Sequence, residues 1–535
     1  MRAKIASKQL VLVMKSFNIT GTCRPNEHYM VDITERLEII RKMIAKGDYF
    51  CINRGRQYGK TTTLNNLKGY LEDVGYCVFS ISFEKVDSIY FSTTSATGAI
   101  FLRLLSICVR RNKIKNLDSK CAELLLSFQD SHKDECTIFD VSELLIQLCS
   151  DNSSPIVLFI DEVDQASEQE AFLKLLGALR DMYLNRDEDA ALQSVILAGV
   201  YDVKNLKLKM RPEEQHQYNS PWNIAAPFDV DMSLPTVGIA GMLAEYKADH
   251  ALAFDEKAVA QLIRDYTSGY PFLVSRICQI IDAEQLSWDK NGVQKAVNMI
   301  LNEGSTLFDD IVKKLNEYPD LEKNIRRVLF KGYRYPFNYY DKATNLALMF
   351  NFVKQQDGAF TISCRMFEIW FYNYFISQDK ASEAFISGQA DKPHFVHDGI
   401  IDMPHLLERF VSHMNKTFNM NKDHKFLEDN GREIFLTYLR PIINGIGNYY
   451  IEAQTRDMDR MDVVIDYLGQ QYVVELKIWR GNAYNERGEE QLRRYLEYFD
   501  LQQGYLLSFC FNKGKTPGLR SPITIGGRTL IEAIV

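Results

Sequence analysis

The amino-acid sequence predicts an α/β protein that contains two separate sheets, and three observations lead to this prediction. In the first half, apolar runs of strand length alternate with helical patterns, which is typical of a buried parallel sheet. The middle of the chain has helical periodicity, with a short hairpin expected around Asp357 and Gly358. Near the C-terminus, two apolar runs flank a polar turn that contains Gly469, which is a hairpin signal.

Composition narrows the class of protein. The chain has 535 residues, 46% hydrophobic and 25% charged, which is ordinary for a globular protein of about three or four domains. The net charge of −7 means that any nucleic-acid contact must be local. The ten cysteines form no CxxC pair, which predicts reduced thiols. No apolar run suits a signal peptide or a membrane span, so we expect a soluble cytoplasmic protein without membrane contact.

The first chemical motif lies in residues 51–62, where a glycine-containing loop separates an apolar strand from a helical pattern. This is the context of a phosphate-binding loop, in which backbone N–H groups at a helix N-terminus hold phosphates. Lys60 would reach the β- and γ-phosphates and Thr61 would hold Mg²⁺. Arg54 stands where the consensus has Gly or Ala, and an ordinary strand-to-helix turn is the alternative. The predicted nucleotide contacts are Gly55, Arg56, Gln57, Tyr58, Gly59, Lys60, Thr61 and Thr62.

The second motif is a continuous apolar strand over residues 156–160 that ends in Asp161 and Glu162. At the C-terminal edge of a parallel sheet, Asp161 would meet Mg²⁺ and Glu162 would polarise the attacking water. Further parallel strands are expected at residues 77–83 and 194–200. Any buried strand that ends in a polar turn is the alternative, but the order and spacing of the two motifs favour a nucleotide site.

The loop Arg56-Gln57-Tyr58-Gly59-Lys60-Thr61-Thr62, with the lead-in at residues 17–30, resembles AAA-like ATPases that carry an Arg-Gln-x-Gly-Lys-Thr-Thr loop. This resemblance implies ATP as the cofactor. In that group the lead-in packs near the adenine, which makes Arg24, His28 and Tyr29 weak candidates for base contacts. A structural role is the favoured interpretation for His28.

A helix start at Gly269-Tyr270-Pro271 resembles the lid motif of switch-type ATPases of the STAND class. There the proline sits near the nucleotide base, so the resemblance implies that Pro271 contacts the nucleotide. Pro in the first turn of an ordinary helix is the alternative. Arg180 and Arg186 are the candidates for an arginine finger, although each fits a solvated helix charge better. ATP binding is therefore the firmer prediction and fast hydrolysis the weaker one.

The segment from about residue 324 to 375 resembles a winged helix, an element that can bind DNA. Its basic residues are Arg326, Arg327, Lys331 and Arg334. The helical spacing of its aromatic residues favours core packing over base stacking. These aromatic residues are Phe367, Trp370, Phe371 and Tyr374.

The C-terminal hairpin contains the third motif, in which Asp462 precedes Glu475-Leu476-Lys477. Alternation places Glu475 and Lys477 on one face of the second strand, and Asp462 can reach the same end. Two carboxylates suit Mg²⁺ or Mn²⁺, which would activate a water while Lys477 stabilises the developing charge. A surface hairpin with scattered charges is the alternative.

With Glu433 on an upstream helix and Gln491 on a downstream helix, this order resembles the PD-(D/E)XK nuclease superfamily. The resemblance implies that Glu433, Asp462 and Glu475 bind metal, that Lys477 is catalytic, and that Gln491 helps to position them. Met461 replaces the proline of the superfamily name. The C-terminal region is locally basic, which suits phosphate contacts in a groove, and a solvated charged face is the alternative. These basic residues are Lys477, Arg480, Arg487, Arg493, Arg494 and Lys513. The expected partner is nucleic acid, DNA rather than RNA.

The predicted organisation is an AAA-like P-loop ATPase domain (1–235), a helical lid (236–318), a winged-helix-like region (319–377), a linker (378–402) and a PD-(D/E)XK nuclease-like domain (403–535). The predicted function is an ATP-regulated, metal-dependent nuclease. The alternative is a nucleotide-dependent sensing or interaction protein that binds nucleic acid or a partner without cutting. A DNA-remodelling ATPase is a weaker third hypothesis. A homo-oligomer and a role in antiviral defence stay open.

Overall fold

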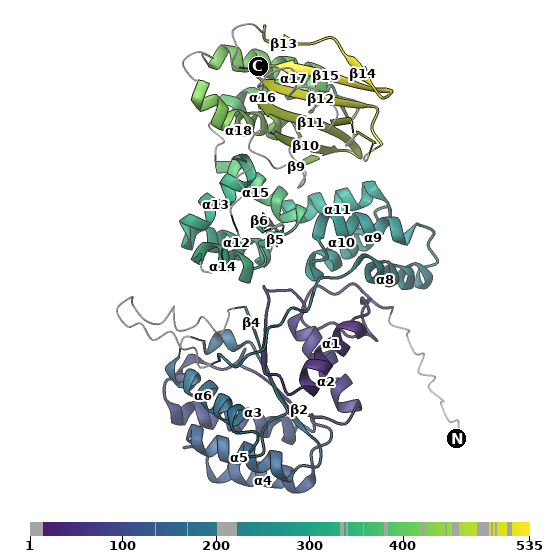
Figure 1. Ribbon diagram of the computed structural model, residues 1–535. Helices are drawn as coiled ribbons and strands as arrows, with labels where there is room; N and C mark the ends of the chain where they lie inside the picture. Colours follow the sequence, from purple (N-terminus) through teal and green to yellow (C-terminus); the bar gives the residue numbers. More distant parts are fainter. Residues whose placement is uncertain are drawn as a thin grey trace, which may run out of the picture. The chain divides into compact units, whose positions relative to one another are not determined.

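Figure 1 shows the computed structural model of the chain. It describes residues 14–133, 135–167, 169–200, 222–331, 336, 338, 341–356, 358–378, 383–418, 424–443, 447–451, 460–478, 492–493, 496–497, 500–510 and 516–535. The chain divides into two compact units. The first unit is Met1–His250 with Tyr270–Ser275, and the second is Ala251–Gly269 with Arg276–Val535. No helix in the described part of the chain combines the length and the apolar character needed to cross a bilayer.

The first unit is built on a parallel sheet in the order β1-β4-β3-β2. Its strands are β1 (Phe50–Asn53), β2 (Cys77–Ser82), β3 (Ile156–Asp161) and β4 (Ser194–Gly199). The two central strands, β3 and β4, are buried along their whole length, as expected when helices cover both faces of a parallel sheet. The predicted parallel sheet is therefore confirmed, and the predicted strand ends differ from the observed ends by at most one residue.

Helices cover both faces of this sheet because each strand alternates its apolar side chains between two cores. Cys51 belongs to one core and Ile52 to the other. Apolar residues of α1 and α2 pack on the Ile52 side, and those of α3, α5 and α6 pack on the Cys51 side. The helices of this unit are α1 (Thr34–Ala45), α2 (Lys60–Asp73), α3 (Thr94–Arg110), α4 (Ser119–Ser131), α5 (Ile138–Asp151), α6 (Glu170–Leu184) and α8 (Thr236–Asp249), with short 3-10 turns η1 (Ser88–Phe91) and η2 (Val163–Gln165).

The second unit begins with helices and a hairpin. Aromatic residues of α15 are buried, with Phe367 and Phe371 at 0% exposure and Trp370 at 9%, so they form a core as their spacing predicted. The hairpin pairs β5 (Val353–Gln356) with β6 (Ala359–Ile362). The helices are α9 (Glu256–Thr267), α10 (Pro271–Ala283, whose first residues belong to the first unit), α11 (Lys290–Asn302), α12 (Thr306–Glu317), α13 (Pro319–Lys331), α14 (Lys342–Met349) and α15 (Arg365–Gln378).

A mixed sheet forms the C-terminal part of the second unit, in the order β13-β15-β12-β11-β10-β9 with β14 beside β15. Strands β9, β10 and β11 pair antiparallel, whereas β11, β12 and β15 pair parallel. The strands are β9 (Gly447–Ile451), β10 (Arg460–Tyr467), β11 (Gln470–Ile478), β12 (Gln503–Phe509), β13 (Gly518–Leu519), β14 (Ile523–Ile525) and β15 (Arg528–Ile534). Two helices before it are α17 (Met403–Thr417) and α18 (His424–Ile443).

The segment 378–402, which the sequence predicts to be a linker, contains a packed helix instead. Helix α16 (Glu383–Phe395) leads into a small hairpin of β7 (Val396–His397) and β8 (Ile400–Ile401). Gly388 lets α16 approach α18 closely, because a Cβ atom there would lie 2.0 Å from the carbonyl oxygen of Tyr438. Asp391 fastens the contact by accepting a hydrogen bond of 2.8 Å from the Tyr438 hydroxyl. Tertiary packing thus orders residues whose composition resembles a linker.

Candidate functional sites

The predicted phosphate-binding loop joins β1 to α2. Gly59 precedes α2 with a φ of +78°, in the left-handed region that glycine tolerates, and Gln57 also has a positive φ of +56°. Lys60 is the first residue of α2 and only 6% exposed. Its Nζ donates to the carbonyls of Arg54 (3.0 Å) and Gly55 (3.1 Å). The ammonium therefore lies inside the loop, where phosphate oxygens can replace the two carbonyls as acceptors.

Thr61 and Asp161 lie together at the C-terminal edge of the sheet. The Thr61 hydroxyl donates to Asp161 Oδ2 at 2.8 Å, although the residues are 100 positions apart. A hydroxyl beside a carboxylate is the donor set that holds Mg²⁺ in phosphate-binding loops, so these residues fit the ion. Thr62 has a different role, because its hydroxyl accepts a hydrogen bond of 3.2 Å from the Cys23 N–H and anchors the lead-in.

Acidic residues surround the Lys60 ammonium. Burial lowers the pKa of Lys60, and the nearby carboxylates of Glu162, Asp164 and Asp161 oppose that shift. Burial likewise raises the pKa of Glu162, which is opposed by Lys60. The Glu162 backbone has a φ of +53°, and its N–H donates to Asp161 Oδ1 at 3.0 Å. This arrangement holds Glu162 directly beside the predicted metal ligand.

Asp164 belongs to this site but was missed by the sequence reasoning. Its Oδ2 accepts a hydrogen bond of 2.7 Å from the Val200 N–H, just beyond the end of β4. A Cβ atom on Gly199 would lie 2.9 Å from Asp164 Oδ1, so the strand end needs glycine there. The acidic residues at 161, 162 and 164 are visible in the sequence, but the hydrogen bond between Asp164 and the Val200 N–H cannot be read from it.

Arg54, at the consensus glycine position, has a structural role. Its guanidinium donates to the carbonyls of Asn53 (2.9 Å) and Val230 (3.0 Å), and it lies 5.6 Å from the centre of the Phe228 ring. Burial lowers the pKa of Arg54. The side chain thus fastens the loop to the segment that follows Trp222, and the departure from the consensus leaves the loop intact.

The Gly-Tyr-Pro motif contacts the phosphate-binding loop within the first unit. The Tyr270 hydroxyl donates to the Arg56 carbonyl at 2.6 Å, and its ring meets the Tyr58 ring edge-on at 4.7 Å. Pro271 Cγ lies 3.8 Å from the position of a Cβ atom on Gly59. The structure therefore brings Pro271 to the loop and adds Tyr270, which the sequence reasoning did not assign.

The weak base-contact candidates fasten the lead-in instead. Tyr29 is 3% exposed, and its hydroxyl donates to Asp249 at 3.1 Å. His28 Nδ1 accepts from the Arg24 N–H at 2.9 Å, which fits the structural role favoured for His28. The Arg24 side chain pairs with Glu27 at 3.1 Å.

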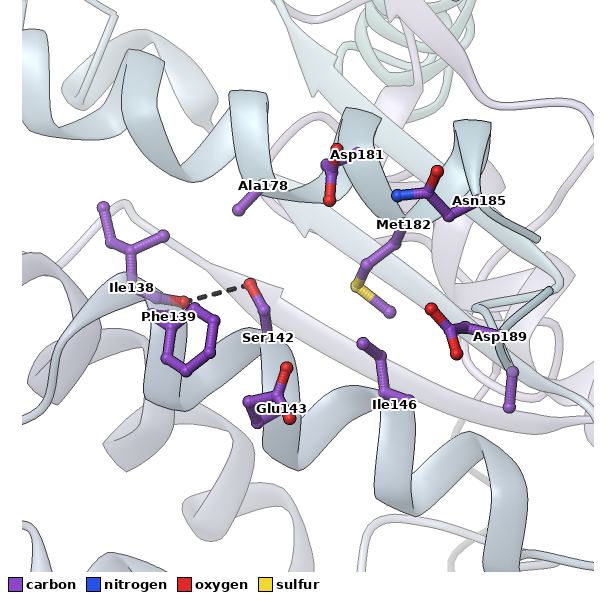
Figure 2. A pocket seen from close by; sticks show the side chains of 11 residues that line it. Ile138, Phe139, Ser142, Glu143, Ile146, Ala178, Asp181, Met182, Asn185 and Asp189 are labelled. Carbon is purple, nitrogen blue, oxygen red and sulfur yellow. Dashed lines mark hydrogen bonds between the residues drawn. The ribbon is translucent and has the colours of Figure 1, made fainter.

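Two further features of the first unit lie away from this loop. Arg186 donates to the Gly47 carbonyl at 3.3 Å, near the start of β1, whereas the phosphate-binding loop follows the end of β1. A pocket of about 360 Å³ lies between α5 and α6 (Figure 2), and its lining includes the apolar Phe139 and Met182 and the acidic Glu143 and Asp181. The residues that line it include none of the predicted nucleotide contacts.

In the C-terminal sheet, β10 and β11 place the third motif as the alternation predicts. Asp462 is directly opposite Glu475, and Arg460 is opposite Lys477. Residues paired in this way share a face, so Asp462, Glu475 and Lys477 belong to one face. Glu475 and Lys477 are both 0% exposed. The Asp462 side chain and the whole of Gln491 lie outside the described residues.

Glu433 lies on α18, which packs on the opposite face of this sheet, where Gly431 adjoins the Phe509 ring. Its carboxylate accepts from Arg326 at 3.5 Å. The Arg326 guanidinium also lies 4.5 Å from the centre of the Phe375 ring. Arg326 therefore contacts both Glu433 and Phe375 within the second unit. Within the described set, which omits the Asp462 side chain, no three His, Cys, Asp or Glu side chains gather into a metal-binding group.

Two polar residues on the Glu475 face were not predicted. Ser508 of β12 is in register with Lys477 and is 0% exposed. Its hydroxyl donates to Glu532 Oε1 of β15 at 2.6 Å. No local signal marks either residue, because only the parallel pairing of β11, β12 and β15 brings them beside Lys477.

Comparisons with known proteins agree with the nucleotide site. The family model described as an AAA-like domain matches residues 23–373, which is more than half of the chain. No curated protein matches. Among solved structures, a Walker-type ATPase of Pyrococcus abyssi has 11% identity and a TM-score of 0.45, covering 66% of this chain and 99% of its own. The ORC2 protein of Aeropyrum pernix, solved as ADPNP-ADP complexes, has 13% identity and a TM-score of 0.36, covering 68% and 97%.

The ORC1 protein of Aeropyrum pernix, solved with DNA, has 13% identity and a TM-score of 0.27, covering 65% of this chain and 94% of its own. All three TM-scores are below 0.5, so we draw no conclusion from these structures. The family match is the stronger finding, since it includes the phosphate-binding loop, the strand that ends in Asp161 and the Gly-Tyr-Pro motif. The chain belongs to the family of proteins with an AAA-like domain.

Proposed function

We propose that this chain is an ATP-regulated, metal-dependent nuclease that hydrolyses phosphodiester bonds of nucleic acid, DNA in preference to RNA. The AAA-like domain would bind ATP at the loop between β1 and α2. Lys60 would donate to the phosphates, while Thr61 and Asp161 would hold Mg²⁺. Glu162, next to Asp161, would orient and polarise the attacking water.

The observation that supports a nuclease is the register of β10 and β11, in which Asp462 faces Glu475 and Lys477 shares their face. Two carboxylates on adjacent strands are suitable ligands for Mg²⁺ or Mn²⁺. A divalent ion bound there would generate a nucleophilic water and neutralise phosphate charge. Lys477 would stabilise the negative charge that develops on the phosphate. The assisting role of Gln491 rests on the superfamily resemblance, whereas Glu433 lies on α18 against the opposite face of the sheet and is left out of the proposed metal site.

In this proposal the domains divide the work. The AAA-like P-loop domain over residues 1–235 would read the nucleotide state, and the helical lid over 236–318 would report it. The winged-helix-like region over 319–377, with the β5–β6 hairpin between α14 and α15, would join the lid to the nuclease-like domain. Because α16 packs on α18, we assign residues 383–401 to the nuclease-like domain.

The test is plasmid cleavage by the full chain. Supercoiled plasmid is incubated with the protein and Mn²⁺, with and without ATP, beside the variants Glu475→Ala and Lys60→Ala. We expect nicked or linear DNA from the wild type, none from Glu475→Ala, and loss of the ATP response in Lys60→Ala. Intact plasmid, single-stranded DNA and RNA under every condition would overturn the proposal, provided that the protein is folded and binds ATP.

A second candidate function is supported by a separate observation. Because Glu475 and Lys477 are fully buried, the sheet also fits a sensing or interaction module that never cuts. Such a module predicts that Glu475→Ala keeps every nucleotide-dependent binding property of the wild type. The nuclease proposal predicts that the same variant keeps ATP binding but loses cleavage, so one variant separates the two functions.

A further inference from the structure

The face of the C-terminal sheet that bears Glu475 is held by a helix of the predicted lid. Asp466 shares this face with Asp462, four residues away on β10, and is only 4% exposed. The hydroxyl of Tyr266, in the last turn of α9, donates to Asp466 Oδ2 at 2.5 Å. Tyr266 is itself 4% exposed. Both residues belong to the second unit, so this is a packed contact within one body.

Helix α11 holds the same corner of the sheet. Lys290 Nζ donates to Gln471 Oε1 at 2.9 Å, and the Gln471 amide in turn donates to Asp466 at 2.7 Å. Asn448 of β9 donates to the side chain of Asn298. These contacts are polar, and water can replace such partners when the surfaces separate, at a net cost of about 1 kcal/mol per hydrogen bond.

The contacts have a consequence for the predicted nuclease site. Glu475 lies on the same face as Asp466, four residue pairs from it along the hairpin, so the clamp contacts hold the turn end of the strand pair that carries Glu475. Glu475 and Lys477 are 0% exposed, whereas a phosphodiester of nucleic acid must reach both side chains. Cleavage therefore requires a rearrangement that uncovers this face.

The chain itself links Tyr266 to the phosphate-binding loop. Only residues 267–269 separate Tyr266 from Tyr270, which donates to the Arg56 carbonyl in the first unit. Within this connection Ser268 has a φ of +48° and Gly269 a φ of +73°. Left-handed residues commonly end a helix, and Ser268 is the C-cap of α9, so the chain turns here between α9 and Tyr270.

We propose that α9 and α11 clamp the sheet through Tyr266–Asp466 and Lys290–Gln471, and that ATP at the phosphate-binding loop releases this clamp. The link to cleavage rests on the proposed nuclease function. ATP phosphates would compete for Lys60 and shift the loop that contacts Tyr270 and Pro271. The short connection would pass that shift to Tyr266, and the hairpin would become accessible.

The experiment compares Tyr266→Phe with Tyr438→Phe in the full chain. Tyr438 is the matched control, because its buried hydroxyl donates to Asp391 at 2.8 Å in the same unit, away from the hairpin. Hydrogen–deuterium exchange of residues 460–478 is measured with and without the ATP analogue AMP-PNP, and plasmid cleavage is measured beside it.

We expect AMP-PNP to raise exchange of residues 460–478 in the wild type. Tyr266→Phe should raise it by about 10- to 150-fold without nucleotide, the effect of losing one buried hydrogen bond to a carboxylate. Tyr438→Phe should leave the exchange of these residues unchanged. Cleavage by Tyr266→Phe should no longer require ATP.

Each result decides between the two proposals. Unchanged exchange in Tyr266→Phe, or an equal rise in Tyr438→Phe, would overturn the clamp even if the wild type cleaves DNA. Raised exchange in Tyr266→Phe and with AMP-PNP, but no cleavage by any variant, would support the clamp and reject the nuclease.

Discussion

Replacing Lys60 by Met is the sharpest perturbation of the nucleotide site. Lys60 is 6% exposed at the start of α2, so an unbranched apolar side chain of similar length can occupy the same space. The substitution removes the ammonium and leaves the carbonyls of Arg54 and Gly55 without its two hydrogen bonds. In the variant, water that enters the loop can satisfy these carbonyls, and we expect the fold to persist.

The size of the effect follows from the lost contacts. In complex with ATP, the ammonium would donate to phosphate oxygens, and hydrogen bonds to charged groups contribute about 1.5–3 kcal/mol. Their loss should weaken ATP binding by about 10- to 150-fold. Titration with a fluorescent ATP analogue measures the Kd, and circular dichroism checks the fold. A Kd within about twofold of the wild type, in a folded variant, would refute the assignment of Lys60.

The pH dependence gives an independent check. Burial lowers the pKa of Lys60 below its ordinary 10.5, and the protonated form is the one that binds phosphate. ATP affinity should therefore fall as the pH rises through the lowered pKa, and Lys60→Met should lack this fall. The contribution of Lys60 to stability has the opposite sign. Between the lowered pKa and 10.5 the unfolded chain binds more protons, so stability rises with pH in that window.

Three further predictions concern the other residues. Glu162→Gln should keep ATP binding and lose hydrolysis, and wild-type hydrolysis should decline on acidification already above pH 4.5, because burial raises the pKa of Glu162; a pH–rate profile checks both. Glu475→Gln, which keeps side-chain size, should abolish plasmid cleavage while ATP titrations stay unchanged. Gly388→Ala should lower the free energy of unfolding by about 1–3 kcal/mol, since its Cβ would lie 2.0 Å from the Tyr438 carbonyl oxygen. As a control, Gly177→Ala has open space around its Cβ and should raise the free energy of unfolding by up to about 1 kcal/mol. Thermal denaturation measures both variants, and equal shifts in Tm would contradict the close packing of α16 on α18.

Sequence reasoning predicted the parallel sheet well because its strands are continuous apolar runs that end in polar turns. The run over residues 156–161 is buried along its whole length, so each position carries the same signal. The C-terminal hairpin was predicted for a related reason. Its period of two and the turn at Gly469 together fix the register that places Asp462 opposite Glu475.

Long-range contacts could not be predicted in the same way. Helix α16 contains Gly388 and Pro393, two residue types that usually indicate a loop when only the sequence is considered. In the folded chain, Gly388 permits the close approach of α16 to α18. The hydrogen-bond partner of Asp164 is the Val200 N–H at the end of β4, and that of Glu532 is Ser508 on the neighbouring strand β12. These residues depend on pairings between segments far apart in the chain, which no local pattern records.

The polar character of the proposed clamp makes control by a single nucleotide energetically feasible. Moving a two-state equilibrium from about 1:99 to 99:1 takes about 5.5 kcal/mol of differential binding. The hydrogen bonds of Tyr266 and Lys290 involve a charged group and contribute about 1.5–3 kcal/mol net each, and that of Asn448 contributes about 0.5–1.5 kcal/mol, so their sum is of the same order as that differential. Full burial of a few Leu or Phe side chains, at about 1.5–3 kcal/mol each, would exceed it. A hydrogen-bonded contact can therefore hold the turn end of the hairpin and still open when ATP binds more tightly to the released state.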